Sequence, residues 1–205
     1  MRLPLFSSIL VFVVWLAYEI RKHTKMDQKP LQDFLERERE ADRTPTKPLD
    51  DLIFIELPWD ELPVSTAPED PEISEVLSIL EGLRDQKIAN LTGYSNTDLK
   101  LKYGAPRIAR LMLWDQNYTV LARTLQKWGK RLLDLGYKEE AIRVLEFALS
   151  TRTDILGTYQ VLLKHYQENG NEEGIAALKE TASGLESLRR DQILALLGEK
   201  GTVLP

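Results

Sequence analysis

The feature that most constrains this fold is an internal repeat with a period of thirty-four residues across residues 121–183. A shift by this period aligns Leu125 with Tyr159, Trp128 with Leu162, Leu132 with Tyr166 and Gly136 with Gly170. Periods of this length are typical of helical repeats, in which one unit buries its apolar face against the next. The period therefore predicts an all-α solenoid of paired helices.

The first repeat shows the spacing of two amphipathic helices. Apolar residues recur every three or four positions, which places them on one helical face: Leu121, Leu125, Trp128, Leu132 and Leu135, then Ala141, Ile142, Leu145, Ala148 and Leu149. Gly136 separates the two runs and supplies the left-handed residue that commonly ends a helix. The second repeat has the same pattern, with its break at Gly170.

One part of the first repeat resembles the tetratricopeptide repeat family. It is the run from Gly136 to Leu149, Gly-Tyr-Lys-Glu-Glu-Ala-Ile-Arg-Val-Leu-Glu-Phe-Ala-Leu. The family's small positions match Gly129 in the first helix and Ala141 and Ala148 in the second. The second repeat departs from the pattern, because Leu163 replaces a small residue and Gly174 fits only with a one-residue deletion. Thr153 also replaces the closing proline.

The resemblance implies repeats over residues 121–154 and 155–184. It also implies binding of a protein or peptide on a concave face, without catalysis. A plain helical bundle with an accidental period is the alternative.

Further helices are expected on both sides of the repeats. Asp70 and Pro71 suit the cap and first position of one helix, and Ser95 with Asp98 suits the capping box of another. A helix opened by Pro106 is expected to cap the first repeat. A closing helix is expected from the apolar run Leu185, Leu188, Ile193, Leu194, Leu196 and Leu197.

The amino-terminal segment is uncharged and mostly apolar from Leu3 to Tyr18. With Glu19 and Ile20 it reaches about the minimum length of a bilayer-spanning helix. A cleaved signal peptide is the alternative, although bulky Trp15 disfavours cleavage after Ala17. The flanking Arg21, Lys22 and Lys25 predict, by the positive-inside rule, that the rest of the chain is cytoplasmic.

The segment between this anchor and the helices is charged. Residues 26–48 are expected to form a solvated spacer with one short exposed helix, ended by Pro45 and Pro48. Residues 49–83 carry acidic side chains and no lysine or arginine. Within them, residues 52–59 have the composition of an extended segment, which has no strand to pair with and must lie on the helices or remain loose.

Basic residues concentrate further on, in residues 100–131: Lys100, Lys102, Arg107, Arg110, Arg123, Lys127, Lys130 and Arg131. Such a stripe suits nucleic acid or anionic lipid. It also complements the acidic residues 49–83 of the same chain, an interpretation that needs no outside partner. Because the net charge is −5, we expect no nucleic-acid partner.

Motifs for chemistry are not apparent. The chain has no cysteine and two histidines, His23 and His165, which offer no metal cluster. No phosphate-binding loop, dinucleotide fingerprint or nucleophile–base motif occurs. We therefore expect no catalytic residues, no cofactor, no metal and no enzymatic activity.

The repeat frame places polar side chains at matching positions of the two first helices. Gln126 and Lys130 correspond to Gln160 and Lys164, and Arg123 lies beside them. These five residues predict a basic strip suited to an acidic extended peptide. A solvated face that happens to repeat is the alternative. The acidic residues 50–63 are a candidate ligand within the chain itself.

Together these features predict an all-α protein with an N-terminal transmembrane helix, a small tetratricopeptide-like solenoid and flanking capping helices. Residues 1–22 form the anchor, residues 23–70 a charged linker with an extended segment, and residues 71–205 the helical domain. We expect a single-pass protein of the cell membrane, with its C-terminal domain cytoplasmic, that binds an unknown protein or acidic peptide. The alternative function is a structural spacer or assembly subunit without a ligand groove.

Overall fold

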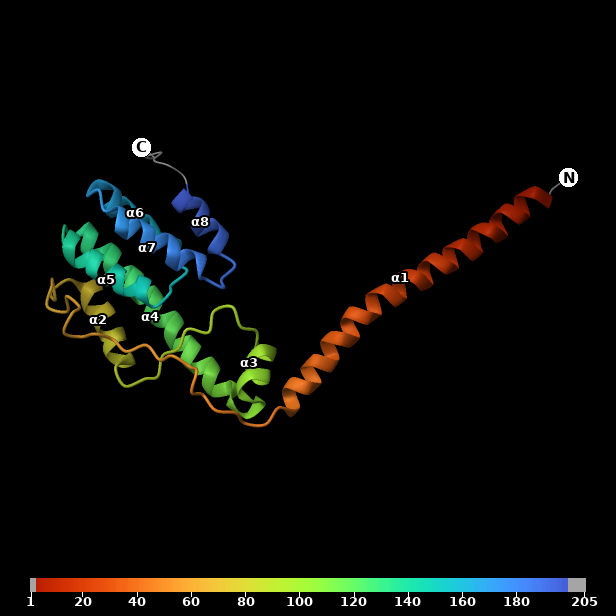
Figure 1. Cartoon of the computed structure of the whole chain (residues 1–205), viewed down its shortest axis with the longest axis horizontal. Coiled ribbons are helices and arrows are strands. Elements are labelled where there is room, and N and C mark those ends of the chain that lie inside the picture. Colours follow the sequence, from red (N-terminus) through yellow and green to blue (C-terminus); the bar gives the residue numbers. More distant parts are fainter. Residues whose placement is uncertain (1–2, 199–205) are drawn as a thin grey trace. The chain divides into compact units, whose positions relative to one another are not determined.

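The computed structural model describes residues 3–198, and for helical residues 3–10, 17 and 20–29 it describes the backbone alone. Its elements are α1 (Leu3–Arg43), α2 (Pro71–Leu83), α3 (Asn96–Tyr103), the 3-10 turn η1 (Ala105–Arg107), α4 (Ile108–Asp134), α5 (Lys138–Ser150), α6 (Leu156–Glu168), α7 (Glu172–Ser183) and α8 (Arg190–Gly198) (Figure 1). Within the described residues every regular element is helical, so the predicted all-α class is confirmed.

The chain divides into two compact units that cut across the predicted domain ranges. Unit 1 comprises Met1–Pro48 and Ser95–Ile108, and unit 2 comprises Leu49–Tyr94 and Ala109–Pro205. Each unit therefore contains segments that are far apart in sequence. The division arises because α3 pairs with the end of α1, whereas α2 packs with the later helices.

In unit 1 the last turns of α1 pack on α3. Ala41 is fully buried, and Lys100 of α3 bonds Asp42 of α1 with an N–O distance of 2.6 Å. Beyond the helix, the Lys47 backbone N–H donates to the Tyr103 carbonyl at 3.0 Å. The prediction that residues 26–48 form only a solvated spacer is therefore wrong for their second half. Three of the charges in this half, Arg37, Glu38 and Asp42, pair with side chains of α3.

The first half of α1 contains the predicted membrane anchor. Among the described residues, none of the helices has an apolar run long enough to cross a bilayer. Most of the predicted anchor, residues 1–22, lies outside the residues whose side chains are described, and so does the His23 side chain. The anchor and the localisation that follows from it remain predictions.

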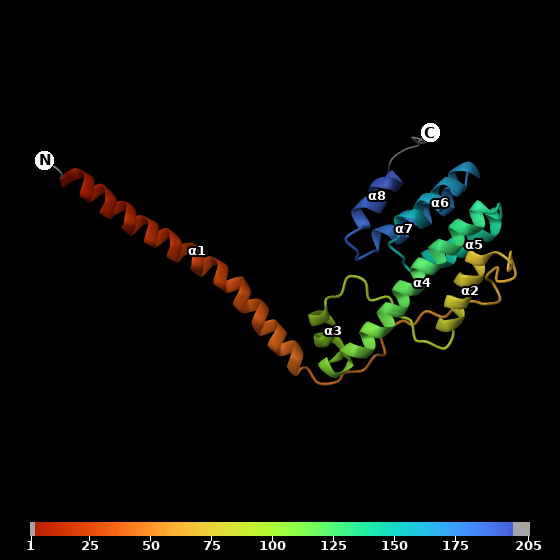
Figure 2. The ribbon, with the colours of Figure 1, turned by 180° about the vertical axis from the view of Figure 1, so that it is seen from behind.

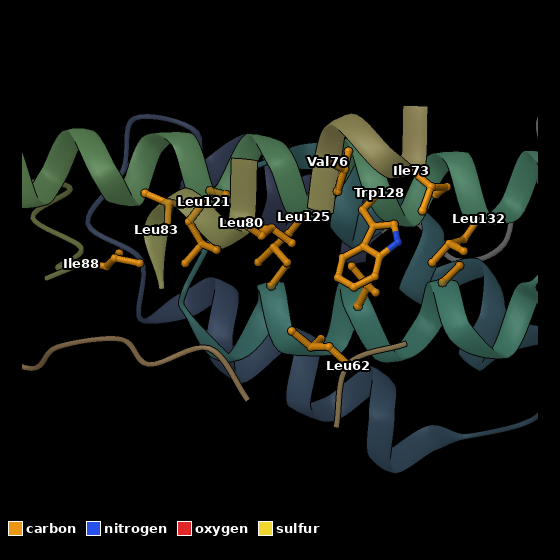
Figure 3. Close-up of a cluster of buried hydrophobic side chains, with 14 of the residues drawn as sticks. Leu62, Ile73, Val76, Leu80, Leu83, Ile88, Leu121, Leu125, Trp128 and Leu132 are labelled. Carbon is orange, nitrogen blue, oxygen red and sulfur yellow. The ribbon is translucent and has the colours of Figure 1, made fainter. Parts of the chain in front are cut away.

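In unit 2 the long helix α4 carries the core. Its apolar face packs with α2, α5 and the segment before α2, and it buries Leu121, Leu125, Trp128 and Leu132 completely (Figure 3). The prediction of a capping helix that begins at Pro106 and precedes the first repeat is wrong. The turn η1 leads straight into α4, which is one continuous helix. No glycine or proline interrupts residues 108–128, so the helix continues through the start of the first predicted repeat at 121.

The helices α5 to α8 follow as short antiparallel elements packed side by side (Figures 1 and 2). They share a second apolar cluster, whose fully buried members include Leu145, Tyr159, Leu162 and Leu178. Gly136 and Gly170 have φ values of +90° and +63° and close the turns after α4 and α6, as their sequence positions predict. Helix α8 begins only at Arg190, so the assignment of Leu188 to the closing helix is wrong.

Each hairpin depends on a glycine where its two helices approach. A Cβ placed at Gly129 of α4 would lie 2.6 Å from Leu145 Cγ of α5. In the next hairpin the glycine is on the other helix, where a Cβ at Gly174 would lie 2.8 Å from the Tyr166 ring. The side chain against Gly129 is therefore the large Leu145. The small residue lies on the first helix of the first hairpin, at Gly129, and on the second helix of the second hairpin, at Gly174. Leu163 can therefore occupy a position of the first helix where the family has a small residue.

We predict that Gly129→Ala lowers the stability of the purified chain by about 1–3 kcal/mol, since the added methyl group overlaps Leu145. Gly82→Ala is the matched control, because Gly82 is also inside a helix and a Cβ there meets nothing within 4 Å. The control is expected to be neutral or stabilising by up to about 1 kcal/mol. Urea unfolding measures both, and equal free energies of unfolding for the two variants would contradict the close approach.

Candidate functional site

One residue of the predicted strip, Gln126 of α4, contacts α6. The Thr158 hydroxyl donates to the Gln126 side-chain oxygen at 2.6 Å. Next to it, a Cβ at Gly157 would lie 2.7 Å from the Gln126 amide nitrogen, so a larger residue there would require the end of this flexible side chain to shift. The first helices of the two hairpins are thus in direct contact at Gln126.

The other four strip residues flank this contact and are exposed. Arg123 and Lys130 lie three residues before and four after Gln126 on α4, and therefore share its face. Gln160 and Lys164 lie three and seven residues after Gly157 on α6, on the face that Gly157 occupies. Three cationic groups and one amide thus border the α4–α6 contact. Gln126 itself is half-buried and serves the helix contact, which the sequence did not indicate.

This surface can make charge-assisted hydrogen bonds with carboxylates. Arginine and lysine donate to carboxylates with roughly twice the strength of neutral pairs, and the amide of Gln160 can pair with a peptide backbone. The residues stand on helices that a buried core fixes in position, so the spacing of the donors is set before any partner arrives.

Residues 49–64, here called the strap, belong to unit 2 and contain no helix, with turns at residues 50–51 and 59–61 on either side of the irregular residues 52–58. Leu62 is buried in the α4 cluster, and Ile55, Leu57, Trp59 and Val64 pack against it half-buried. The strap therefore docks within its own chain, but on the apolar side of α4. This corrects the hypothesis that it occupies the basic strip. Burial of large apolar side chains contributes about 1.5–3 kcal/mol each, which exceeds what exposed ion pairs contribute.

Cations cover the outer aromatic rings of the strap. The Lys87 ammonium lies 4.5 Å from the centre of the Phe54 ring, and that ring meets Trp114 edge-on at 5.0 Å. The Arg84 guanidinium lies 4.3 Å from the centre of the Trp59 ring. A backbone bond from the Ile55 N–H to the Ile88 carbonyl, 2.9 Å long, fixes the register. The turn after α2 thus holds the strap in place.

The predicted pairing of the acidic segment with the basic stripe is confirmed between α2 and α4. The Arg131 guanidinium binds both carboxylate oxygens of Asp70, at 2.5 and 3.1 Å, and Lys127 binds Glu75 at 2.6 Å. Asp70 also caps α2 by accepting the Glu72 and Ile73 N–H groups. Its hydrogen bond with Arg131, helped by those N–H groups, lowers the pKa of Asp70 from 3.8 to about 2.

The connection between α5 and α6 is held by residues that the sequence did not single out. The Asn90 amide donates to the carbonyls of Thr151 and Arg152, at 3.0 and 3.2 Å. The Tyr159 hydroxyl donates to the Thr153 carbonyl at 2.9 Å. Ser187, from the loop before α8, donates to Asp154. This connection is therefore tied both to the loop after α2 and to the carboxyl-terminal part of unit 2.

Several sequence candidates have structural roles. The amides of Asn90 and Asn117, which open glycosylation triplets, both donate to backbone carbonyls, Asn117 to that of Lys87. His165 is half-buried on α6 with its ring edge against Tyr166. Within the described residues no three histidine or acidic side chains gather to hold a metal ion.

Comparison of the chain with models of protein families, with curated proteins and with solved structures gives no match.

We predict that Arg131→Gln destabilises the chain strongly at neutral pH and only weakly near pH 2. The folded-state pKa of Asp70, about 2, lies below its unfolded value of 3.8. The stabilisation by the ion pair is therefore complete above pH 3.8 and is lost as the pH falls through 2. Denaturant unfolding between pH 2 and 7 measures the difference between parent and variant.

The matched control for this experiment is Arg123→Gln, an exposed arginine on the same helix. It is expected to change the stability little at any pH. If the loss in free energy of unfolding caused by Arg131→Gln is the same from pH 7 to pH 2, the stabilisation by Arg131 does not come from its ion pair with Asp70.

Proposed function

We propose that this chain is a membrane-anchored protein-interaction module. In this proposal α4 to α7 are two tetratricopeptide-like hairpins, and the strip of Arg123, Gln126, Lys130, Gln160 and Lys164 receives an acidic, extended segment of a partner protein. The helical part is cytoplasmic and the chain has no catalytic activity. The alternative remains a spacer or assembly subunit without a ligand groove.

The observation that carries the proposal is the contact of Gln126 with Thr158 and Gly157. It makes the first helices of successive hairpins neighbours at Gln126, which supports a shared face for the strip residues of both helices. A solvated face that repeats by accident would need no such contact. Occupation of the apolar side of α4 by the strap also supports the strip as the surface left for a partner.

The anchor is supported by the uncharged stretch at Leu3 to Tyr18 and by the basic residues after it. The backbone of α1 is helical from Leu3, and the helix continues to Arg43. At its far end the helix is bonded to α3. These features suit a span that leads directly into a folded region.

We predict that partner proteins captured from detergent extracts are lost when Lys130→Glu and Lys164→Glu are combined. Reversal of two of the strip's cations repels carboxylates, whereas it leaves the core intact because both side chains are exposed. Lys179→Glu, an exposed lysine on α7, is the control and should retain the same partners. Identical partner sets for all three proteins would favour the spacer.

We predict that Ser65, when replaced by cysteine in this cysteine-free chain, is protected from an impermeant maleimide in intact cells. Ser65 is exposed, so that a cysteine there reacts once the reagent reaches it. Labelling is expected only after lysis, because the positive flank places unit 2 in the cytoplasm. Rapid labelling before lysis would contradict this prediction and show that unit 2 lies outside the cytoplasm.

A further inference from the structure

Lys127 lies within the row of strip residues on α4, although the thirty-four-residue period does not mark it. It follows Arg123 by four residues and precedes Lys130 by three, so it shares one side of the helix with both. Its side chain is 41% exposed, and its ammonium binds the Glu75 carboxylate of α2 at 2.6 Å. A further cation thus stands beside the strip, and it is already engaged within the chain.

The pair of Lys127 with Glu75 can exchange its carboxylate, because the pair is open to water. The Glu75 side chain is 59% exposed. Water and salt screen the charges of such a pair, and two long side chains lose rotamer freedom when they form it, so the pair is weak. Another carboxylate that reaches Lys127 can therefore replace that of Glu75 at little cost to the fold.

The neighbouring pair of Arg131 with Asp70 cannot exchange in this way. The Asp70 side chain is only 11% exposed, and its carboxylate accepts two backbone N–H groups at the start of α2 in addition to both bonds from Arg131. A second carboxylate would have to disrupt the helix cap in order to replace it. The two pairs thus differ in role: Asp70 fixes α2, whereas Glu75 occupies a cation of the surface proposed for the partner.

The pair with Glu75 also shows which chemistry this side of α4 accepts. Glu75 belongs to residues 49–83, which carry acidic side chains and no lysine or arginine. Its carboxylate on Lys127 is therefore the same kind of group that the strip is proposed to receive. Residues 116–133 of α4 contain no aspartate or glutamate, so the helix itself supplies no competing carboxylate there. At Lys127 the group that an incoming acidic segment has to displace is Glu75.

We propose that Lys127 is a further binding residue for the acidic partner segment, and that Glu75 is a competitor built into the chain. This inference rests on the proposed function, because it adds a residue and its regulation to the same site. A segment with few carboxylates leaves Glu75 in place. A segment with several carboxylates binds the neighbouring cations at the same time, which raises its effective concentration at Lys127 and displaces Glu75. The competitor thus makes the surface selective for densely acidic segments.

The test measures the binding of a fluorescently labelled hexaglutamate peptide to the full-length chain in detergent, by fluorescence anisotropy at low salt. Glu75→Gln removes the charge of the competitor and keeps its shape. The strength of exposed ion pairs corresponds to a change of at most about fivefold in a dissociation constant. We expect Glu75→Gln to tighten peptide binding by about two- to fivefold, and Lys127→Gln to weaken it by a similar factor.

The matched control is Glu81→Gln. Glu81 lies on the same helix and its side chain is 58% exposed, but it pairs with Arg84 at the end of α2 and not with α4. The two glutamate variants change the net charge equally, so a general attraction of the peptide is the same in both. We expect Glu81→Gln to bind the peptide as the parent does. Equal affinities of Glu75→Gln and Glu81→Gln would overturn the proposal.

A double variant separates competition at Lys127 from an effect elsewhere on the chain. In the Lys127→Gln background no ammonium is left for Glu75 to occupy, so Glu75→Gln should no longer change the peptide affinity. A gain from Glu75→Gln that persists in this background would show that Glu75 acts through another group, and would also overturn the proposal.

Failure of this proposal is distinguishable from failure of the proposed function. The combined Lys130→Glu and Lys164→Glu variant tests the strip with the same peptide. Binding that is lost in this variant, but is the same in the parent, Glu75→Gln and Lys127→Gln, would refute the competitor alone. Absence of peptide binding in both the parent and Glu75→Gln would refute both proposals.

Discussion

Burial of one face of α4 is the interaction on which the rest of unit 2 depends. Helix α2 and the strap pack on this face together with α5, around a Trp128 side chain that has no exposed surface (Figure 3). Each large side chain buried there contributes about 1.5–3 kcal/mol. Elements from three parts of the sequence therefore share one stabilising surface, and α4 occupies its centre. Of the strip residues, Arg123, Gln126 and Lys130 lie on the other side of that helix, and Gln160 and Lys164 lie on α6.

Ion pairs at the edge of this core determine the position of α2 more than its stability. Exposed pairs such as Lys127 with Glu75 contribute at most about 1 kcal/mol. Asp70 differs, because it caps α2 and also binds Arg131 through both carboxylate oxygens. These bonds fix the position of the start of α2 against α4. The acidic and basic segments of the sequence thus complement each other between α2 and α4.

The helical class and many helix ends were predictable because they depend on local chemistry. Gly136 adopts the left-handed conformation its position required, Asp70 caps α2, and Ser95 with Asp98 forms the capping box. The surface on which the strap docks was not predictable, because its residues come together only when α2, α4 and α5 pack. The pairing of Lys100 with Glu38 and Asp42 escaped prediction for the same reason, as about sixty residues separate the partners.

The strip could be predicted in part. The thirty-four-residue period indicated Gln126 with Gln160 and Lys130 with Lys164, since exposed positions of a helix repeat follow the same register as buried ones, whereas Arg123 corresponds to Gly157 and was included because it lies beside them. The period could not indicate that Gln126 bonds Thr158 next to Gly157, because that contact forms only when α4 and α6 pack. The reach of a single amide into the space left by a glycine on another helix has no signature in either helix alone.

The pairing of α1 with α3 also imposes an order on synthesis. The charged half of α1 leaves the ribosome long before residues 96–103, and the strap and α2 are made in between. Glu38 and Asp42 therefore stay hydrated, without their lysine, until Lys100 has emerged, and unit 1 closes only after that point. Folding of unit 1 is thus coupled to the arrival of the chain's middle.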